Sequence, residues 1–317
     1  MLKAIRVVIF VVFVTLAFVD RAVAAACPPA LKQPTADMIQ GGMKNARDHG
    51  FLWRISKDAR TSYLYGTIHV AKFDWMFPGP QVTNALRATD TLALEMDMLD
   101  PDIQNRLVKG MALLRNTAMP APLLKRMRQQ AEGLCVPYDT LTTLSPELQV
   151  TNLTMLSGRQ DGLEAGYAID AVLAGIGHKA KKNVVSLESP EMQLQVLQMH
   201  STQETLAFVA DSLDELETGR SFKMLKRIAG LWADADYGEM ANFDEWCECL
   251  DTGTEREVMK RAYDERNPAL AEHIDALHGS GKRVFAAVGS LHMFGPLGLP
   301  DLMKKRGYRV ERVIFAN

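Results

Sequence analysis

The sequence has no excess of charge of either sign, which limits the partners it can bind. Its 317 residues include 36 Lys and Arg against 38 Asp and Glu, a formal net charge of -2. Proteins that bind nucleic acid or anionic membranes usually carry a basic patch or stripe. The mixed charges therefore argue against a nucleic-acid partner, while 47% hydrophobic residues are enough to build a sizeable core.

Long hydrophobic runs are also missing, except at the N-terminus. Two positive charges precede an apolar run over residues 7–19, and a small-residue stretch then reaches Ala24. The run is too short to span a bilayer as a helix and is typical of a secretory signal peptide. We expect residues 1–24 to be the signal peptide and residues 25–317 to form one periplasmic domain without a stable membrane span. A membrane anchor, or a lipoprotein acylated on Cys27, is the alternative.

The signatures of several enzyme classes are absent. No Gly-x-Ser-x-Gly turn surrounds Ser62, Ser186 or Ser290, which argues against a serine hydrolase. There is no Gly-rich phosphate loop and no dinucleotide fingerprint. Cysteine is scarce, and the four cysteines allow three pairings between which the sequence does not choose. We expect structural disulfides or buried thiols rather than a soft-metal site at Cys247 and Cys249.

The chain does contain β-like runs at both ends, separated by a long helical region. Strands are predicted at residues 51–55, 63–69, 91–97, 183–188, 282–292 and 308–315. Helical patterns broken by proline fill residues 101–177, where no chemistry is recognisable, and continue from residue 190 to about residue 279. We therefore expect an α/β fold, a single domain with a central mixed sheet built from both chain ends and a large helical insertion.

Two Gly-x-x-His motifs end predicted strands that are far apart in the sequence. Gly66 precedes His69, and Gly289 precedes His292. Glycine lets a backbone or a ligand approach closely, and imidazole is a common metal ligand and a common general base. The two histidines are predicted to be partners at one site, although core histidines bonded to backbone groups give the same pattern.

Carboxylates at strand ends supply the rest of the predicted site. Glu95 lies in the apolar run of residues 91–97, Asp97 shares its strand face, and Glu188 ends the run of residues 183–188. Burying a carboxylate is costly unless it meets a cation or hydrogen-bond donors. Two histidines and one carboxylate suit a divalent ion of the manganese, iron, cobalt or zinc group, and they leave coordination positions open for water and substrate.

Several short motifs also occur in a fixed order along the chain. They are Tyr65-Gly66-Thr67-Ile68-His69-Val70, Leu94-Glu95-Met96-Asp97, Val185-Ser186-Leu187-Glu188 with Gln193, Arg266-Asn267, and Val288-Gly289-Ser290-Leu291-His292-Met293-Phe294-Gly295. This set resembles the signature of the TraB/PrgY/GumN family over residues 51–313. The resemblance implies a fold related to the erythromycin-esterase and ChaN-like group. It also implies a relationship to the Tiki metalloproteases, which use two Gly-x-x-His motifs and an acidic residue.

Carried over to this sequence, the resemblance points to His69, His292 and Glu95 as the ligands of a divalent transition metal, Mn, Co, Zn or Fe. Glu188 or Asp97 would then be a neighbouring partner or the proton acceptor. Arg266 would orient a carboxylate or bind an anionic end of the substrate. Ser290-Leu291 stands where relatives often have two small residues, but no predicted ligand is lost.

These inferences predict an exported metal-dependent hydrolase, peptidase-like, that acts on a peptide or small-molecule substrate. One alternative is hydrolysis without a metal, with His69 or His292 as the general base and Glu95 orienting it, as in an esterase. A second alternative is a non-catalytic periplasmic protein that binds a peptide or haem. The sequence leaves the substrate and the oligomeric state open.

Overall fold

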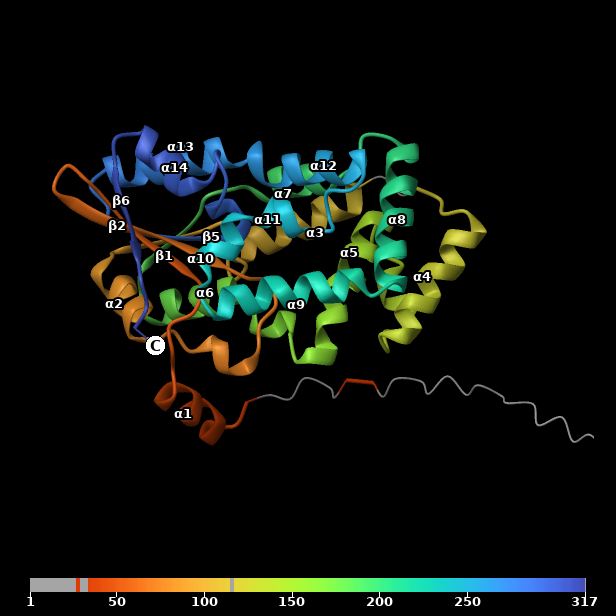
Figure 1. Ribbon diagram of the computed structural model, residues 1–317, viewed down its shortest axis with the longest axis horizontal. Helices are drawn as coiled ribbons and strands as arrows, with labels where there is room; N and C mark the ends of the chain where they lie inside the picture. The colour runs from red at the N-terminus through yellow and green to blue at the C-terminus, as the bar shows by residue number, and fades with distance from the viewer. Residues whose placement is uncertain (1–26, 29–33, 115–116, 317) are drawn as a thin grey trace, which may run out of the picture.

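The centre of the molecule is one six-stranded mixed sheet (Figure 1). The computed structural model describes residues 27–28, 34–114 and 117–316. The strands are β1 (Phe51–Lys57), β2 (Arg60–Thr67), β3 (Thr91–Leu94), β4 (Asn183–Ser186), β5 (Val284–Gly289) and β6 (Arg309–Val313), in the order β4-β3-β5-β2-β1-β6. The predicted α/β fold, with a sheet built from both chain ends, is confirmed.

Strand direction divides the sheet into two parts. β2, β5, β3 and β4 run parallel to one another, whereas β1 is antiparallel to both β2 and β6. β1 and β2 form a hairpin through a two-residue turn at Asp58 and Ala59, whose φ values of 50° and 57° suit a tight hairpin turn. The four parallel strands present their carboxyl ends at one edge of the sheet.

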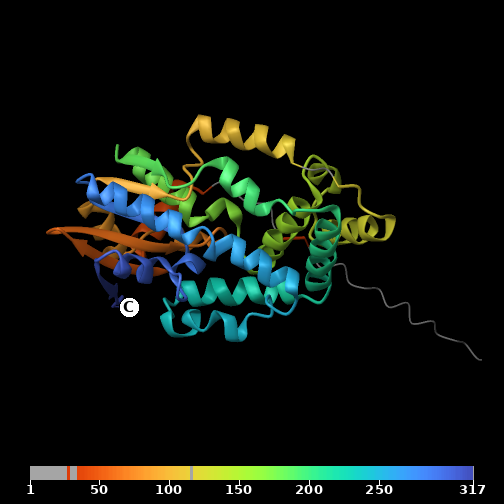
Figure 2. The ribbon, with the colours of Figure 1, turned by 90° about the horizontal axis from the view of Figure 1, so that it is seen from above.

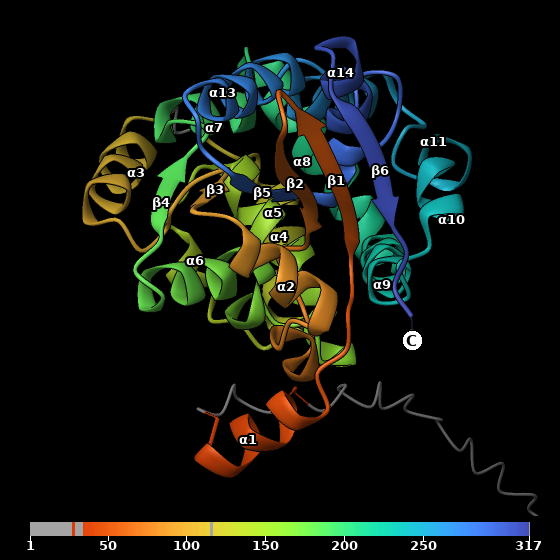
Figure 3. The same cartoon turned by 90° about the vertical axis from the view of Figure 1, so that its left-hand side faces the viewer.

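Helices cover both faces of the sheet, as Figures 1 and 3 show. On one face lie α2 (Pro80–Ala88) and α6 (Ile169–Lys179), and on the other lie α13 (Asn267–Gly279) and α14 (Leu299–Lys305). The remaining α-helices are α1 (Ala36–Lys44), α3 (Pro101–Leu113), α4 (Ala121–Gly133), α5 (Pro146–Ser157), α7 (Pro190–Leu197), α8 (Thr202–Glu217), α9 (Arg220–Ala233), α10 (Tyr237–Ala241), α11 (Phe243–Trp246) and α12 (Gly253–Met259). Because helices cover both faces, β3 and β5 are apolar and almost wholly buried.

The predicted helical insertion forms a lobe beside the sheet (Figures 1 and 2). α4, α5 and α8 pack around a buried cluster of their own, which includes Met127, Leu153 and Val209. α5 begins at Pro146 and α7 begins at Pro190, as proline at the first helical position predicts. The large helical insertion is confirmed.

Five of the strands end two or three residues earlier than the sequence predicts, among them β4 at Ser186 and β6 at Val313. β2 ends at Thr67 rather than at residue 69, and β3 ends at Leu94 rather than at residue 97. β5 ends at Gly289, after which the chain turns into a short 3₁₀ helix, η6 (Ser290–Met293). Apolar periodicity does not predict these turns. Because of them, both histidines lie beyond the ends of their strands, past the edge of the sheet.

All four cysteines are paired in disulfides. Cys27 is bonded to Cys135, at a sequence separation of 108, and Cys247 is bonded to Cys249. The expectation of structural disulfides is confirmed. The predicted signal peptide, residues 1–24, lies outside the described residues. Within the part of the chain that the structure describes, no helix is long and apolar enough to cross a membrane.

Candidate functional site

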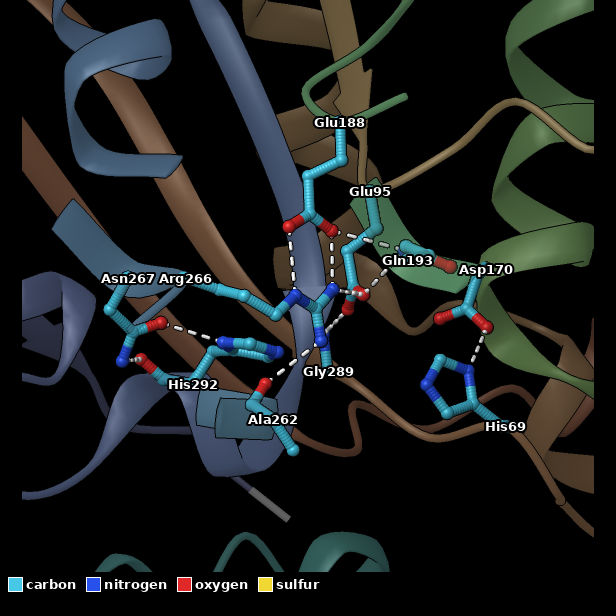
Figure 4. A network of polar contacts seen from close by, with 10 residues as sticks. All are labelled: His69, Glu95, Asp170, Glu188, Gln193, Ala262, Arg266, Asn267, Gly289 and His292. Carbon is cyan, nitrogen blue, oxygen red and sulfur yellow. Dashed lines mark hydrogen bonds and ion pairs between the residues drawn. The ribbon is translucent and has the colours of Figure 1, made fainter. Parts of the chain in front are cut away.

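The four parallel strands end at one edge, and a polar residue follows each of them. His69 follows β2, Glu95 follows β3, Glu188 follows β4, and His292 lies in η6 directly after β5. The carboxyl edge of such a sheet is where α/β proteins usually bind their ligands. Figure 4 shows the two imidazoles on either side of Glu95 and Gly289. The structure therefore brings the predicted metal ligands into one region.

Glu95 is held at both carboxylate oxygens by hydrogen-bond donors. Its Oε1 accepts from the backbone N–H of Gly289 at 2.6 Å, and its Oε2 accepts from Nη2 of Arg266 at 2.7 Å. Burial alone would raise the pKa of Glu95, but the two histidines, Arg266 and the Gly289 amide together lower this pKa to about 2. Glu95 is therefore an anion at neutral pH.

Arg266 joins Glu95 to the second carboxylate of the site. Its Nε donates to Oε1 of Glu188 at 2.8 Å, and its Nη2 also contacts Oε2 of Glu188. Gln193 of α7 completes the network, donating to Glu188 at 3.0 Å and to Glu95 at 3.2 Å. Arg266 follows η5 (Lys260–Asp264), a turn of π-helix, a conformation that is frequent at functional sites. The structure thus places Arg266 with both glutamates named from the sequence.

Asn267 determines which nitrogen of His292 carries a proton. The side-chain amide of Asn267 donates to the backbone oxygen of Leu297 at 2.9 Å, so its Oδ1 is the atom that faces His292. Nδ1 of His292 lies 2.6 Å from this oxygen and donates to it. Burial lowers the pKa of His292 to about 4, so the ring is neutral at pH 7 and Nε2 keeps a free lone pair.

A carboxylate holds the other imidazole. Nδ1 of His69 lies 2.6 Å from Oδ2 of Asp170, which is in the first turn of α6. The negative charge of Asp170 raises the pKa of His69 to about 9. The side chain of His69 is 56% exposed, whereas His292 is only 2% exposed. One imidazole therefore meets solvent, the other is enclosed, and in both the nitrogen that remains unengaged is Nε2.

Gly289 keeps a small space open between these side chains. A Cβ atom at Gly289 would lie 3.2 Å from Oε1 of Glu95, 3.6 Å from Nε2 of His69 and 3.6 Å from Cδ2 of His292. All three side chains thus border one small space, the size of a methyl group. Any residue other than glycine would fill it.

Gly66, the glycine of the first motif, has a different structural role. A Cβ atom there would lie 3.0 Å from Oγ and 3.2 Å from Cα of Ser290, and 3.3 Å from Cγ of Met293. Gly66 therefore lets η6 pack closely on β2, which positions His292.

The donor chemistry of the site suits a divalent transition metal. Histidines that bind metals usually present one ring nitrogen and donate from the other to an oxygen, as His69 and His292 both do here. Oε1 of Glu95 borders the same space. In the described residues, however, no three His, Cys, Asp or Glu side chains form a group that could hold a metal ion. The donor atoms are of the types that such an ion binds, but they do not converge on a common coordination position.

Asp97 does not take part in this network. Its Oδ2 lies 2.6 Å from Nε2 of His178, and its Oδ1 accepts from the backbone N–H of Leu99. Since β3 ends at Leu94, the alternation that placed Asp97 on the strand face of Glu95 does not reach it.

Asp170 is a candidate site residue that the sequence does not reveal. An acidic residue in the first turn of a helix is common because it interacts favourably with the helix dipole, and so Asp170 gives no distinct signal. It belongs to residues 101–177, where the sequence shows no recognisable chemistry. Only the fold brings it to His69.

The chain is similar in sequence to known proteins over most of its length. The sequence profile of the TraB/PrgY/gumN family matches residues 51–312. The chain is 25% identical over 251 residues to the uncharacterized protein YbaP of Shigella flexneri, covering 77% of this chain and 88% of the relative. Its identity to the uncharacterized protein YbaP of Escherichia coli (strain K12) is 24%, with the same coverage. No solved structure matches. The chain, with its two histidine motifs at one sheet edge, belongs to the TraB/PrgY/gumN family.

Proposed function

We propose that the protein is a metal-dependent hydrolase, and that His69, His292 and Glu95 hold the ion. The observation that carries the proposal is the matched orientation of the two histidines. Each gives its Nδ1 to an oxygen acceptor, Asp170 or Asn267, and each leaves Nε2 unengaged. Imidazoles held in this way are preorganised to bind a metal.

The charges around the site favour a cation as well. Glu95, Glu188 and Asp170 are three carboxylates, and Arg266 is the one guanidinium in contact with any of them among the described residues. Buried carboxylates need compensating positive charge. A divalent ion would supply it.

A bound divalent ion would polarise a substrate carbonyl and lower the pKa of water. The chain's own residues do the positioning. Glu188, which accepts from Gln193, fixes the guanidinium of Arg266, and Arg266 together with the Gly289 amide fixes the carboxylate of Glu95. Gly289 leaves room for a reacting atom beside that carboxylate. Asp97 is not proposed as the proton acceptor, because its carboxylate is bonded to His178.

The substrate we propose is a peptide or another small molecule with a hydrolysable carbonyl group, and the N-terminal segment favours a periplasmic location. Elemental analysis tests the metal directly. Protein purified without chelator or nickel affinity is compared with His69→Ala, His292→Ala and the control His178→Ala, which removes a histidine that is paired with Asp97 away from the site.

Near-stoichiometric metal in the wild type and in His178→Ala, but not in the two site variants, supports the proposal. The proposal fails if the wild type holds no metal, even after incubation with manganese, cobalt or zinc. Quenched fluorescent peptides then provide the activity assay for the loaded protein.

A metal-independent hydrolase is the second candidate, and the pairing of His69 with Asp170 favours it. A carboxylate bonded to Nδ1 also orients histidines that act as acid or base in hydrolysis. Chelators separate the two candidates, because turnover that survives chelation and complete metal removal requires the second.

A further inference from the structure

Thr67, inside the first histidine motif, has a buried hydroxyl that lacks a hydrogen-bond partner in the described part of the chain. The residue is 1% exposed, and Oγ1 has no hydrogen bond within the described part of the chain. Leaving a buried hydroxyl unsatisfied destabilises the folded protein. A group of this kind at the edge of a binding site calls for an explanation.

The backbone oxygens of residues 66–68, by contrast, all accept hydrogen bonds. The backbone oxygen of Gly66 accepts from Nε1 of Trp232 at 2.8 Å, and that of Thr67 accepts from Oγ of Ser290 at 2.8 Å. The backbone oxygen of Ile68 accepts from the N–H of Ile169 at 3.0 Å. The backbone carbonyls of residues 66–68 are thus all bonded within the fold, whereas the Thr67 hydroxyl has no partner among the described residues.

Strand register places Thr67 beside the space at Gly289. Thr67 of β2 is paired with Gly289 of β5 in a parallel ladder, so their side-chain directions share one face of the sheet. Paired positions on adjacent strands are about 5 Å apart. The Cβ of Thr67 is therefore next to the point that Glu95, His69 and His292 border.

We propose that the Thr67 hydroxyl binds the substrate, donating a hydrogen bond to the oxygen of the carbonyl group that is hydrolysed. This assignment rests on the proposed hydrolytic function and names one residue that contacts the substrate. The hydroxyl has no partner among the described residues because the substrate supplies it. As negative charge develops on the carbonyl oxygen, the hydrogen bond strengthens, so Thr67 acts mainly on the rate of reaction.

Thr67→Val, which replaces the hydroxyl by a methyl group, is the central variant. Because no bond inside the protein is lost, the thermal unfolding midpoint of Thr67→Val should equal or exceed that of the wild type. Thr91→Val is the matched control, since Thr91 is a fully buried strand residue whose hydroxyl is bonded to Asp90 at 3.0 Å. That control should unfold at a lower temperature. An equal loss in both variants would overturn the proposal, because the Thr67 hydroxyl would then be bonded within the fold.

Peptide hydrolysis gives the second readout. Thr67→Val should lower kcat about tenfold with a smaller change in KM, and Thr67→Ser, which keeps the hydroxyl, should recover most of the rate. Thr117→Val serves as control, because Thr117 also has a buried hydroxyl without a partner in the described residues but follows α3 in the helical insertion. Its kcat should not change. Unchanged kcat in Thr67→Val would overturn the proposal.

Failure of the hydrolytic function itself is distinguished by a binding measurement. If no peptide is cleaved by the wild type, acetohydroxamate, a small carbonyl-bearing probe, is titrated while the unfolding midpoint is followed. A stabilisation that is lost in Thr67→Val and kept in Thr67→Ser supports the role of Thr67 in ligand binding. An equal response, or none, in all three proteins overturns it.

Discussion

Asp170 and His69 meet at 2.6 Å through Nδ1, while Nε2 of the same ring faces the space at Gly289. Asp97 and His178 meet at the same distance elsewhere in the molecule, through Nε2. Both are carboxylate–imidazole pairs, but only the first lies at the candidate site. Variants of the second pair therefore serve as controls for variants of the first.

Asp170→Asn should weaken metal binding about 10- to 100-fold, as loss of the group that orients a ligand histidine usually does. The amide has nearly the same shape but lacks the charge that favours the correct ring orientation. Competition with a fluorescent chelator measures the affinity. Asp97→Asn should bind the metal like the wild type, and an equal loss in both variants would show that Asp170 has no specific role.

The same pair predicts how stability of the metal-free protein depends on pH. The pKa of His69 is raised from its ordinary 6.5 to about 9, chiefly by Asp170, so the folded state binds this proton more tightly than the unfolded state. The resulting stabilisation is fully present below pH 6.5 and is lost as the pH rises through 9. Urea unfolding at a series of pH values should show this decline in the wild type. In Asp170→Asn the decline should be much smaller.

Gly289→Ala should abolish metal binding and turnover while leaving the protein folded. The added methyl group would lie 3.2 Å from Glu95 and 3.6 Å from both imidazoles, where it fills the space of the site. The backbone of Gly289, with φ of -48° and ψ of 140°, is accessible to alanine. Circular dichroism and elemental analysis report fold and metal. Gly279→Ala, on α13 with nothing within 4 Å, should behave like the wild type.

A second pH dependence is expected from the helical insertion. Burial, with a contribution from the neighbouring carboxyl group of Glu255, raises the pKa of Glu215 from 4.5 to about 7. The folded state therefore holds this proton more tightly, and the stabilisation is present below pH 4.5 and lost as the pH rises through 7. Glu215→Gln keeps the neutral form at all pH values. Its unfolding midpoint should fall less than that of the wild type between pH 5 and 8, and parallel curves would contradict the assignment.

The two disulfides should contribute very differently to stability. A cross-link stabilises mainly by restricting the unfolded chain, and the effect grows with the length of the loop. Replacing Cys27 and Cys135, which are 108 residues apart, by serine should cost on the order of 2–5 kcal/mol. The same change at Cys247 and Cys249, two residues apart, should cost much less. Denaturant unfolding of both double variants gives the comparison.

Much of this architecture could be predicted from the sequence because its signals are local. Apolar runs predict all six strands, and proline at the first helical position predicts where α5 and α7 begin. His69, Glu95, Glu188 and His292 could be named because polar residues at the ends of apolar runs are conspicuous. Their meeting at one edge also follows, since parallel strands share their carboxyl end.

What could not be predicted depends on contacts between distant elements. Asp170 reaches His69 only because α6 packs against the sheet with its first turn at the carboxyl edge. Asp97 lies beyond the end of β3, where the alternation of side chains stops, and it turns to His178 instead. The tautomer of His292 depends on the orientation of the Asn267 amide, which is fixed by the backbone oxygen of Leu297.

The position of β5 in the sheet also determines when the proposed site can first form. β5 lies between β2 and β3, and the hydrogen bond between Thr67 and Ser290 joins residues 223 positions apart. A ribosome completes His69, Glu95 and Glu188 long before it reaches the strand that separates β2 from β3. Until β5 is translated, no strand joins β2 to β3, so the histidines cannot lie at a common edge of the sheet. Under the proposed function, nascent chains and C-terminal truncations that lack β5 should not hydrolyse substrate.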